Sequence, residues 1–264
     1  MASHRPSGRS AECFDFERMV CITEIEGVLV NEEALHIGTA AVEAQKGVDN
    51  PVERGCPPEA KDVARRVPYI PGSSLKGVLR STAERLVRSG LLGEGRWVCN
   101  PFSREDKRRE DREGPCVICQ IFGGGGEREN RIASHVMVYD AFPQDPDSVR
   151  VRTRTRVAIS RLKGGAAGGR LFSVELVEPG TRWRFRMRII NIDLEDEEDE
   201  RAKVLRELLK LLRKGLIHVG GGRSVGLGRV KLEEAEVSIY EIKDGALKER
   251  EKEDLDIVIG LRRS

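Results

Sequence analysis

The feature that most constrains the fold is an unbroken alternation of basic and apolar residues from Arg182 to Ile189. Its apolar positions are Trp183, Phe185, Met187 and Ile189. Because successive side chains of a strand point to opposite faces, this period of two predicts a strand with one buried and one polar face. Such a strand is stable only in a sheet whose apolar face is covered. The chain therefore requires a sheet packed against a second layer.

Two other segments repeat apolar residues at helical spacing and predict the helices of that second layer. One runs from Ser74 to Arg88 and the other from about residue 197 to residue 214. Further strands are predicted at residues 19–30, 132–139, 149–157, 171–177, 216–219 and 228–240. This order predicts an α+β fold with helices on one face of an antiparallel sheet.

The start of the first helix combines a turn with basic side chains. Pro71 and the glycine after it predict the turn, and Ser73 or Ser74 can cap the helix. Lys76 and Arg80 follow, one turn apart, beside the apolar stripe. A helix N-terminus presents unpaired N–H groups and partial positive charge, so this segment suits an anion such as phosphate. An ordinary capped helix with a solvated basic edge is the alternative.

Charge is segregated along the chain, although the formal net charge is only +2. Residues 150–188 are strongly basic, whereas residues 193–200 are almost entirely acidic. A basic segment in a nearly neutral protein indicates a polyanionic partner at one surface. The acidic run is typical of a solvated loop and helix start, because acidic side chains favour the positive end of a helix.

Residues 148–177, within the basic segment, are predicted to form a long hairpin with a glycine-rich tip. Arg152, Arg154 and Arg156 fall on one face of its first strand, and Arg161 lies near the tip. Like charges on one strand face repel, and phosphate contacts would relieve that repulsion. The alternative is an ordinary solvated strand face.

The composition excludes several classes of protein. No run of ~18 apolar residues is present, so no transmembrane helix and no membrane partner are expected. Residues 1–15 lack the apolar core of a signal peptide and are predicted to form a flexible arm, and residues 243–264 a charged tail. The 6 cysteines are too few for a disulfide scaffold, which favours a cytoplasmic protein with reduced thiols.

Three of those cysteines are spaced like the ligands of a zinc knuckle. Cys116 and Cys119 form a C-x-x-C pair, and Cys99 precedes them in the same charge-rich insertion. A structural zinc ion would replace the apolar core that this insertion lacks, but it needs four ligands. Cys56 is the candidate for the fourth ligand, with His135 as the second choice.

A glycine-dense loop spans residues 220–228 and matches neither of the common nucleotide-binding loops. It also leads into a predicted strand and not into a helix. Its backbone amides can line a groove for a phosphate chain, with Arg223 and Arg229 nearby. The alternative is a tight, permissive turn between two strands.

Taken together, these segments resemble the RAMP superfamily, the repeat-associated proteins of CRISPR effector complexes. The resemblance is carried by residues 35–38, 47–51, 69–77 with Arg80, Cys116-x-x-Cys119 followed by Phe122-Gly123, and the loop 220–228. Their order is similar to that of the backbone subunit of type III effectors, which polymerises along the guide RNA. The resemblance implies a modified RRM-like (ferredoxin-like) core with an inserted zinc-knuckle region and a β-hairpin thumb.

The resemblance also implies how the chain is divided. A RAMP domain would span residues 16–242, and it would contain a catalytic loop at 31–67, a zinc-binding insertion at 91–131 and the thumb at 148–177. The stretch from Val52 to Val67 is longer than the family pattern leads us to expect.

Asp49 matches the family's catalytic aspartate, and His36 aligns with a family histidine near the RNA. From the residues alone, Asp49-Asn50-Pro51 is typical of a turn, and His36 of a packed or hydrogen-bonded residue at a strand end. The residues expected to contact RNA are His36, Ser73, Ser74, Lys76, Arg80, Arg152, Arg154, Arg161 and Arg223.

The expected function is therefore to bind guide RNA and to cut the target RNA that pairs with it. The 2′-hydroxyl of RNA is its own nucleophile, so Asp49 with a divalent metal such as Mg or Mn could suffice. Copies of the chain and other CRISPR effector subunits are the expected protein partners. One alternative is a non-catalytic, guide-RNA-binding subunit. A stand-alone endoribonuclease that processes the guide precursor would need an acid and base pair that the histidines do not offer.

Overall fold

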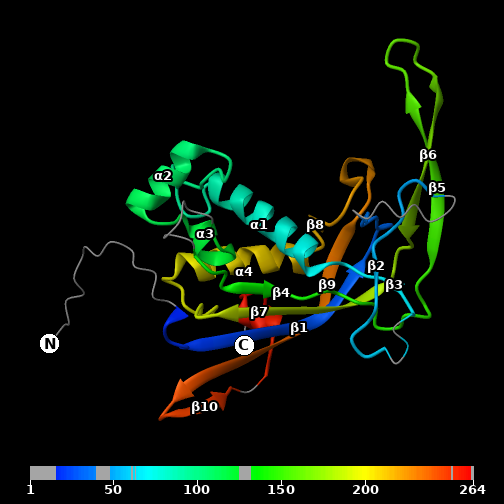
Figure 1. The fold of residues 1–264 in the computed structure, drawn as a ribbon. Helices are drawn as coiled ribbons and strands as arrows, with labels where there is room; N and C mark the ends of the chain where they lie inside the picture. Colours follow the sequence, from blue (N-terminus) through cyan, green and yellow to red (C-terminus); the bar gives the residue numbers. More distant parts are fainter. Residues whose placement is uncertain are drawn as a thin grey trace.

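The computed structural model describes residues 16–39, 48–60, 62, 64–124, 132–250 and 252–262, so the arm predicted at residues 1–15 lies outside it. The main sheet is antiparallel and has the order β10-β9-β1-β7-β4 (Figure 1). Its strands are β1 (Cys21–Asn31), β4 (Val136–Val138), β7 (Arg182–Ile190), β9 (Arg229–Lys243) and β10 (Ala246–Glu249). β8 (Ile217–His218) and β11 (Glu253–Asp254) also pair with β9.

The alternating segment forms β7, as predicted, and lies in the middle of the sheet between β1 and β4. Its apolar side chains Trp183, Phe185, Met187 and Ile189 are all buried in the main core. The Trp183 indole donates a hydrogen bond of 3.0 Å to the Asn31 Oδ1, so the one polar atom of this buried ring is satisfied.

Two long helices, α1 (Gly72–Arg88) and α4 (Glu200–Arg213), cover one face of the sheet (Figure 1). The acidic run leads into α4 as predicted, because Asp199 caps this helix by accepting a hydrogen bond from the Arg201 N–H. The element order β1-α1-β4-β7-α4-β9, with β1 and β7 adjacent at the centre, is consistent with an RRM-like core. The predicted α+β class is therefore confirmed.

The opposite face of β7 corrects one inference from charge. Arg182, Arg184, Arg186 and Arg188 belong to the basic segment that indicated a polyanion, yet each forms an ion pair with glutamate. Arg186 lies 3.2 Å from the Glu24 carboxylate on the neighbouring β1, and Arg184 lies 2.6 Å from Glu59. These arginines neutralise acidic residues of the same chain. The hairpin is therefore the part of the basic segment that can attract a polyanion.

The start of α1 also differs from the prediction. Neither Ser73 nor Ser74 caps the helix; the Asp140 carboxylate instead accepts a hydrogen bond of 2.7 Å from the Gly72 N–H. This carboxylate already satisfies part of the helix end that was expected to bind phosphate. Gly77 is not required by packing, because outside its chain neighbours and the backbone of its own helix no atom lies within 4 Å of its Cβ position.

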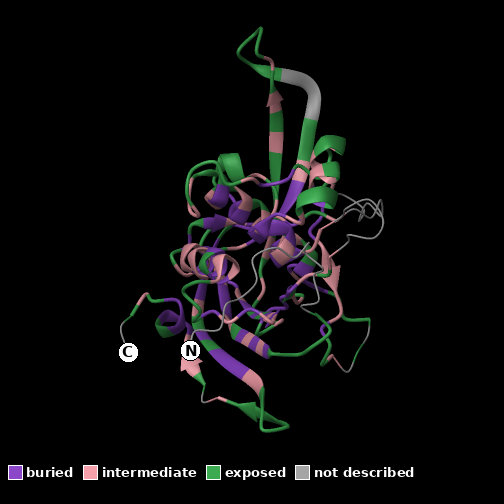
Figure 2. Cartoon of the chain, turned by 90° about the vertical axis from the view of Figure 1, so that its left-hand side faces the viewer, coloured by how far each residue is buried: buried purple, intermediate pink, exposed green. Residues whose placement is uncertain are grey.

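Three smaller units project from this core. The predicted hairpin is formed by β5 (Val151–Ile159) and β6 (Ala166–Val177), which rise well away from the body and are largely exposed (Figures 1 and 2). The insertion holds α2 (Arg104–Glu113) and α3 (Val117–Phe122), and the long first connection holds the short pair β2 (Arg54–Gly55) and β3 (Val67–Pro68). No helix among the described residues is both long and apolar enough to cross a bilayer.

The described part of residues 243–264, predicted as a charged tail, contributes two strands and a short helix to the fold. After β10 and β11, the short helix α5 (Leu255–Val258) buries Leu255 and Val258 in the main core. The Arg213 guanidinium donates two hydrogen bonds of 2.6 Å to the Asp256 carboxylate. The many charged residues around Leu255 and Val258 led to the prediction of a charged tail.

Candidate functional site

Asp49 lies at the base of the hairpin, where the first long connection runs along the edge of β6. Its Oδ2 accepts a hydrogen bond of 2.6 Å from the Ser173 N–H and one of 2.8 Å from the Ser173 hydroxyl. The Ser173 hydroxyl oxygen also accepts a bond of 2.9 Å from the Asp49 N–H. These bonds favour the charged form and hold the pKa of Asp49 below its usual value. The result is an exposed, ionised and oriented carboxylate.

His36 is held on the same edge of β6. Its Nδ1 lies 2.8 Å from the Glu175 carbonyl oxygen, two residues along the strand from Ser173. Because the backbone groups of residues two apart in a strand point to the same edge, His36 and Asp49 contact neighbouring positions of one strand edge, about 7 Å apart along it. The structure thus brings together the two residues that the resemblance placed near RNA.

The Glu175 side chain holds the segment that follows Asp49 against β6. Its carboxylate accepts hydrogen bonds of 3.0 Å from the Val52 N–H and 2.8 Å from Arg54. Burial disfavours the charged carboxylate, but the bonds from Arg54 and Val52 outweigh burial and lower the pKa of Glu175. Arg54 and Val52 belong to the stretch that is longer than the family pattern, and they fix the segment after Asp49 to the hairpin.

The glycine loop closes against His36. The Gly221 N–H donates a 2.8 Å hydrogen bond to the His36 carbonyl oxygen, and a Cβ at Gly220 would lie 2.2 Å from that oxygen. Gly220 also has a φ of 79°. Glycine is therefore required at position 220 for close approach as well as for the turn. The guanidinium of Arg156 lies beside the same loop, 3.4 Å from the Cβ position of Gly222.

The remaining predicted basic residues form two groups, one at the hairpin and the glycine loop and the other on α1. Arg154 and Arg161 are exposed and have no ion partner among the described residues, whereas Arg152 pairs with Glu178 at 2.7 Å. Arg223 lies on an exposed 3-10 turn (Arg223–Val225) and lines a groove with residues of α1 and β8. These residues lie on the hairpin or in the glycine loop.

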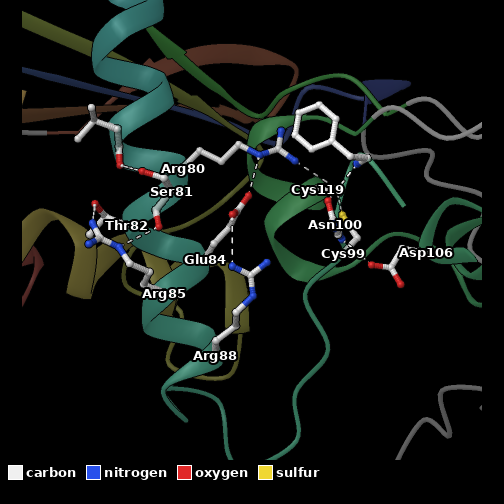
Figure 3. A network of polar contacts seen from close by, with 12 residues as sticks. Arg80, Ser81, Thr82, Glu84, Arg85, Arg88, Cys99, Asn100, Asp106 and Cys119 are labelled. Atoms are coloured by element: carbon white, nitrogen blue, oxygen red, sulfur yellow. Dashed lines mark hydrogen bonds and ion pairs between the residues drawn. The ribbon is translucent and has the colours of Figure 1, made fainter. Parts of the chain in front are cut away.

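Lys76 and Arg80, in contrast, point from α1 toward the cysteine-containing insertion. The Lys76 ammonium donates a bond of 2.7 Å to the Ser134 hydroxyl, and burial lowers its pKa. Arg80 donates to the Gly123 carbonyl oxygen at 2.8 Å and to the Cys119 sulfur at 3.5 Å (Figure 3). Both side chains are used inside the chain, and their expected RNA contacts stay predictions.

The three predicted cysteines meet beneath α1 and form a group that can hold a metal ion. Their sulfur atoms and a Glu110 carboxylate oxygen all lie within 4.8 Å of one another, and all four residues are buried. Donors about 2.3 Å from a tetrahedral ion lie roughly 4 Å apart, so the spacing fits. Glu110 Oε1 is buried with no hydrogen-bond partner, which a bound cation would supply.

Glu110 replaces the predicted fourth ligand. Cys56 is outside the group, and its sulfur lies 3.6 Å from the Pro57 carbonyl oxygen. His135 is also elsewhere: its Nδ1 lies 2.6 Å from the Ile190 carbonyl oxygen. Within the group, hydrogen bonds from Cys119 and Cys99 lower the pKa of the Cys116 thiol. The hydrogen bonds to Cys116 in turn raise the pKa of the Cys99 and Cys119 thiols, so the negative charge is concentrated on one of the three sulfurs.

Sequence reasoning missed two residues of these sites. Ser173 gives little signal, because a serine within an alternating strand is normally read as a surface position. Glu110 is the only buried residue of the otherwise charged helix α2, and no periodicity reveals this. Each is identified only by the partner that the fold brings to it.

The chain belongs to the RAMP superfamily, whose profile matches residues 32–231. Among curated proteins it is similar to three that carry the name CRISPR system Cms endoribonuclease Csm3. The protein from Methanocaldococcus jannaschii is 30% identical over 239 residues, covering 86% of this chain and 87% of the relative. Those from Methanothermobacter thermautotrophicus and Streptococcus thermophilus are 25% and 27% identical, covering 81% and 80% of this chain and 84% and 89% of the relatives. The resemblance inferred from the motifs is thus confirmed.

Proposed function

We propose that this protein is the backbone subunit of a type III CRISPR ribonucleoprotein, which binds guide RNA and cleaves the target RNA paired with it. The names of the three relatives support endoribonuclease activity. The observation that carries the assignment of the site is the Asp49 carboxylate, exposed and oriented by Ser173 at the base of the arginine-bearing hairpin. His36, Arg154, Arg161 and the glycine loop supply the RNA contacts around it.

Cleavage uses the RNA's own nucleophile. The 2′-hydroxyl loses its proton to solvent and attacks the adjacent phosphorus, the bond from phosphorus to the 5′-oxygen breaks, and that oxygen takes up a proton. The products are a 2′,3′-cyclic phosphate and a 5′-hydroxyl. Asp49 would hold a divalent ion together with RNA phosphates, and this ion supplies charge stabilisation at the phosphate. The hairpin and His36 would keep the strand in line for attack.

The test is cleavage of labelled complementary RNA by the assembled complex. Asp49→Asn keeps the shape of the side chain and removes its charge, so we expect cleavage to fall about 100-fold or more while RNA binding is retained. Asp62→Asn is the matched control, because Asp62 is an exposed aspartate of the same connection. Equal cleavage by the Asp49→Asn and unmodified complexes would remove Asp49 from the reaction, and no cleavage by the unmodified complex with metal present would leave the non-catalytic, guide-binding role.

We further propose that the ion held by Cys99, Glu110, Cys116 and Cys119 is zinc with a structural role. The sulfur-rich donor set and the burial of all four residues support this assignment. We expect Cys116→Ser and Glu110→Gln to lower both bound zinc, measured by elemental analysis, and the thermal midpoint of unfolding. Cys56→Ser should change neither. Loss of zinc in Cys56→Ser, or full zinc in Glu110→Gln, would contradict the ligand set.

A further inference from the structure

The outer face of α2 carries a row of arginines that the proposed function does not use. Arg104, Arg108 and Arg112 are spaced four residues apart, so their side chains follow one stripe of the helix about 6 Å apart. All three are exposed, and none forms an ion pair within the described residues. Guanidinium groups at this spacing repel one another, and the exposed Glu105 and Asp111, each three residues from Arg108, offset only part of that repulsion.

Three of the acidic residues of α2 form contacts within the insertion, so the formal charge of the helix differs from the charge that its outer face presents. The Asp106 carboxylate accepts a 2.6 Å hydrogen bond from the Asn100 N–H, Glu110 belongs to the metal group, and Glu113 pairs with Arg109 at 2.7 Å. Glu105 and Asp111 are exposed, and so is Glu113, whose charge is paired with Arg109. The helix is formally neutral, but its outer face is positive.

An aromatic side chain stands at the end of this row. Phe102, just before the helix, is 94% exposed. The backbone that carries it is held in place, because the Phe102 N–H donates a 3.0 Å hydrogen bond to the Asn100 Oδ1 and Ser103 caps α2. An exposed ring gains free energy when a partner covers it, and a nucleic-acid base offers a flat face on which it can stack.

We propose that the α2 stripe (Arg104, Arg108, Arg112) and Phe102 form a second RNA-contact surface. A single strand would lie along α2, with successive phosphates against the arginines and one base stacked on Phe102. The arginines recur once per helical turn. This even spacing suits the regularly spaced phosphates of an RNA strand better than the irregularly placed carboxylates of a protein surface. This surface lies at the opposite end of the molecule from the hairpin (Figure 1), and it does not depend on cleavage at Asp49.

The experiment measures binding of a labelled single-stranded RNA to the full chain over a range of salt concentrations, by fluorescence anisotropy. In the triple variant Arg104→Gln/Arg108→Gln/Arg112→Gln we expect the slope of log affinity against log salt to flatten by about 2. The control Lys243→Gln/Lys248→Gln/Lys252→Gln removes the same charge from exposed positions near the C-terminus. It should leave the slope nearly unchanged.

Stacking is tested separately with Phe102. We expect Phe102→Ala to weaken RNA binding about tenfold without changing the salt slope, and Phe102→Tyr to retain affinity. Zinc content and the thermal midpoint of each variant show that the insertion stays folded.

Three results would overturn the proposal. One is an unchanged slope in the arginine variant, and a second is an equal change in the lysine control. The third is intact RNA affinity together with lost assembly of the complex, which would assign the α2 stripe to an acidic protein partner. This test measures RNA binding by the chain and not cleavage, so failure of this proposal is distinct from failure of the proposed cleavage.

Discussion

The orientation of Asp49 depends on a single neighbouring residue, Ser173. The carboxylate receives one hydrogen bond from the backbone of Ser173 and one from its hydroxyl. The backbone donor survives any substitution, whereas the hydroxyl also accepts the bond from the Asp49 N–H. The serine side chain therefore restrains both ends of the aspartate.

We expect Ser173→Ala to raise the pKa of Asp49 toward its ordinary value and to slow cleavage about tenfold, because the carboxylate loses one donor and its fixed direction. Ser173→Thr retains the hydroxyl and should restore both properties. Carbon-13 NMR titration of the isolated chain reports the pKa without requiring activity. An Asp49 pKa that is the same in the serine and alanine forms would disprove this role.

The pH dependence of the site follows from the same bonds. Because the folded-state pKa of Asp49 is lowered, its hydrogen bonds stabilise the folded loop above the ordinary pKa, and this contribution disappears as the pH falls through the lowered value. Glu175, whose pKa is also lowered, acts in the same direction. We expect exchange of the Asn50 and Val52 amide hydrogens to accelerate, relative to the intrinsic rates, only on the acidic side. Acceleration toward neutral pH would contradict the sign.

Among the elements, helix α1 offers a test with an internal control. A Cβ at Gly72 would lie 2.2 Å from the Val138 carbonyl oxygen, whereas nothing lies within 4 Å of the Cβ position of Gly77. Gly72→Ala should therefore lower the free energy of unfolding by about 2 kcal/mol or more. Gly77→Ala should raise it by up to about 1 kcal/mol, since alanine is the better helix former. Denaturant titrations that rank the two variants in the other order would disprove the packing.

Periodicity predicted these elements well because burial imposes it. The alternation in β7 and the helical stripe of α1 both correspond to side chains that the fold buries. What periodicity cannot predict is which partner a polar residue meets. Asp140 caps α1 from a distant segment, and Glu24 neutralises Arg186 and Arg188 across a strand pair. Long-range pairing of this kind depends on the topology and not on local propensity.

The candidate sites were predictable to different extents for the same reason. Asp49, His36 and the three clustered cysteines were found through motifs, which record chemistry at a fixed spacing. Ser173 and Glu110 were missed, since each contributes through a contact formed only after folding. Cys56 was chosen as a ligand by residue type alone, and its position in the fold excludes it from the group.

For the whole molecule, the integrated C-terminal segment predicts a stability contribution that a charged tail would not make. Leu255 is fully buried, whereas Leu247 on β10 is 60% exposed. We expect Leu255→Ala to cost about 2–5 kcal/mol of unfolding free energy and Leu247→Ala to cost well under 1 kcal/mol. Differential scanning calorimetry of the full chain measures both. Similar midpoints for the two variants would show that the segment is not part of the core.

The hairpin of β5 and β6 has a mechanical consequence. Strands of this length extend roughly 30 Å, and Leu162 near the tip is 97% exposed. Apolar groups carried so far from the body gain nothing from the folding of their own chain. Only contact with a second molecule can bury them, so the orientation of the hairpin relative to the body depends on the molecule that it binds. Selection can therefore alter its tip with little penalty to the folding of the domain beneath it.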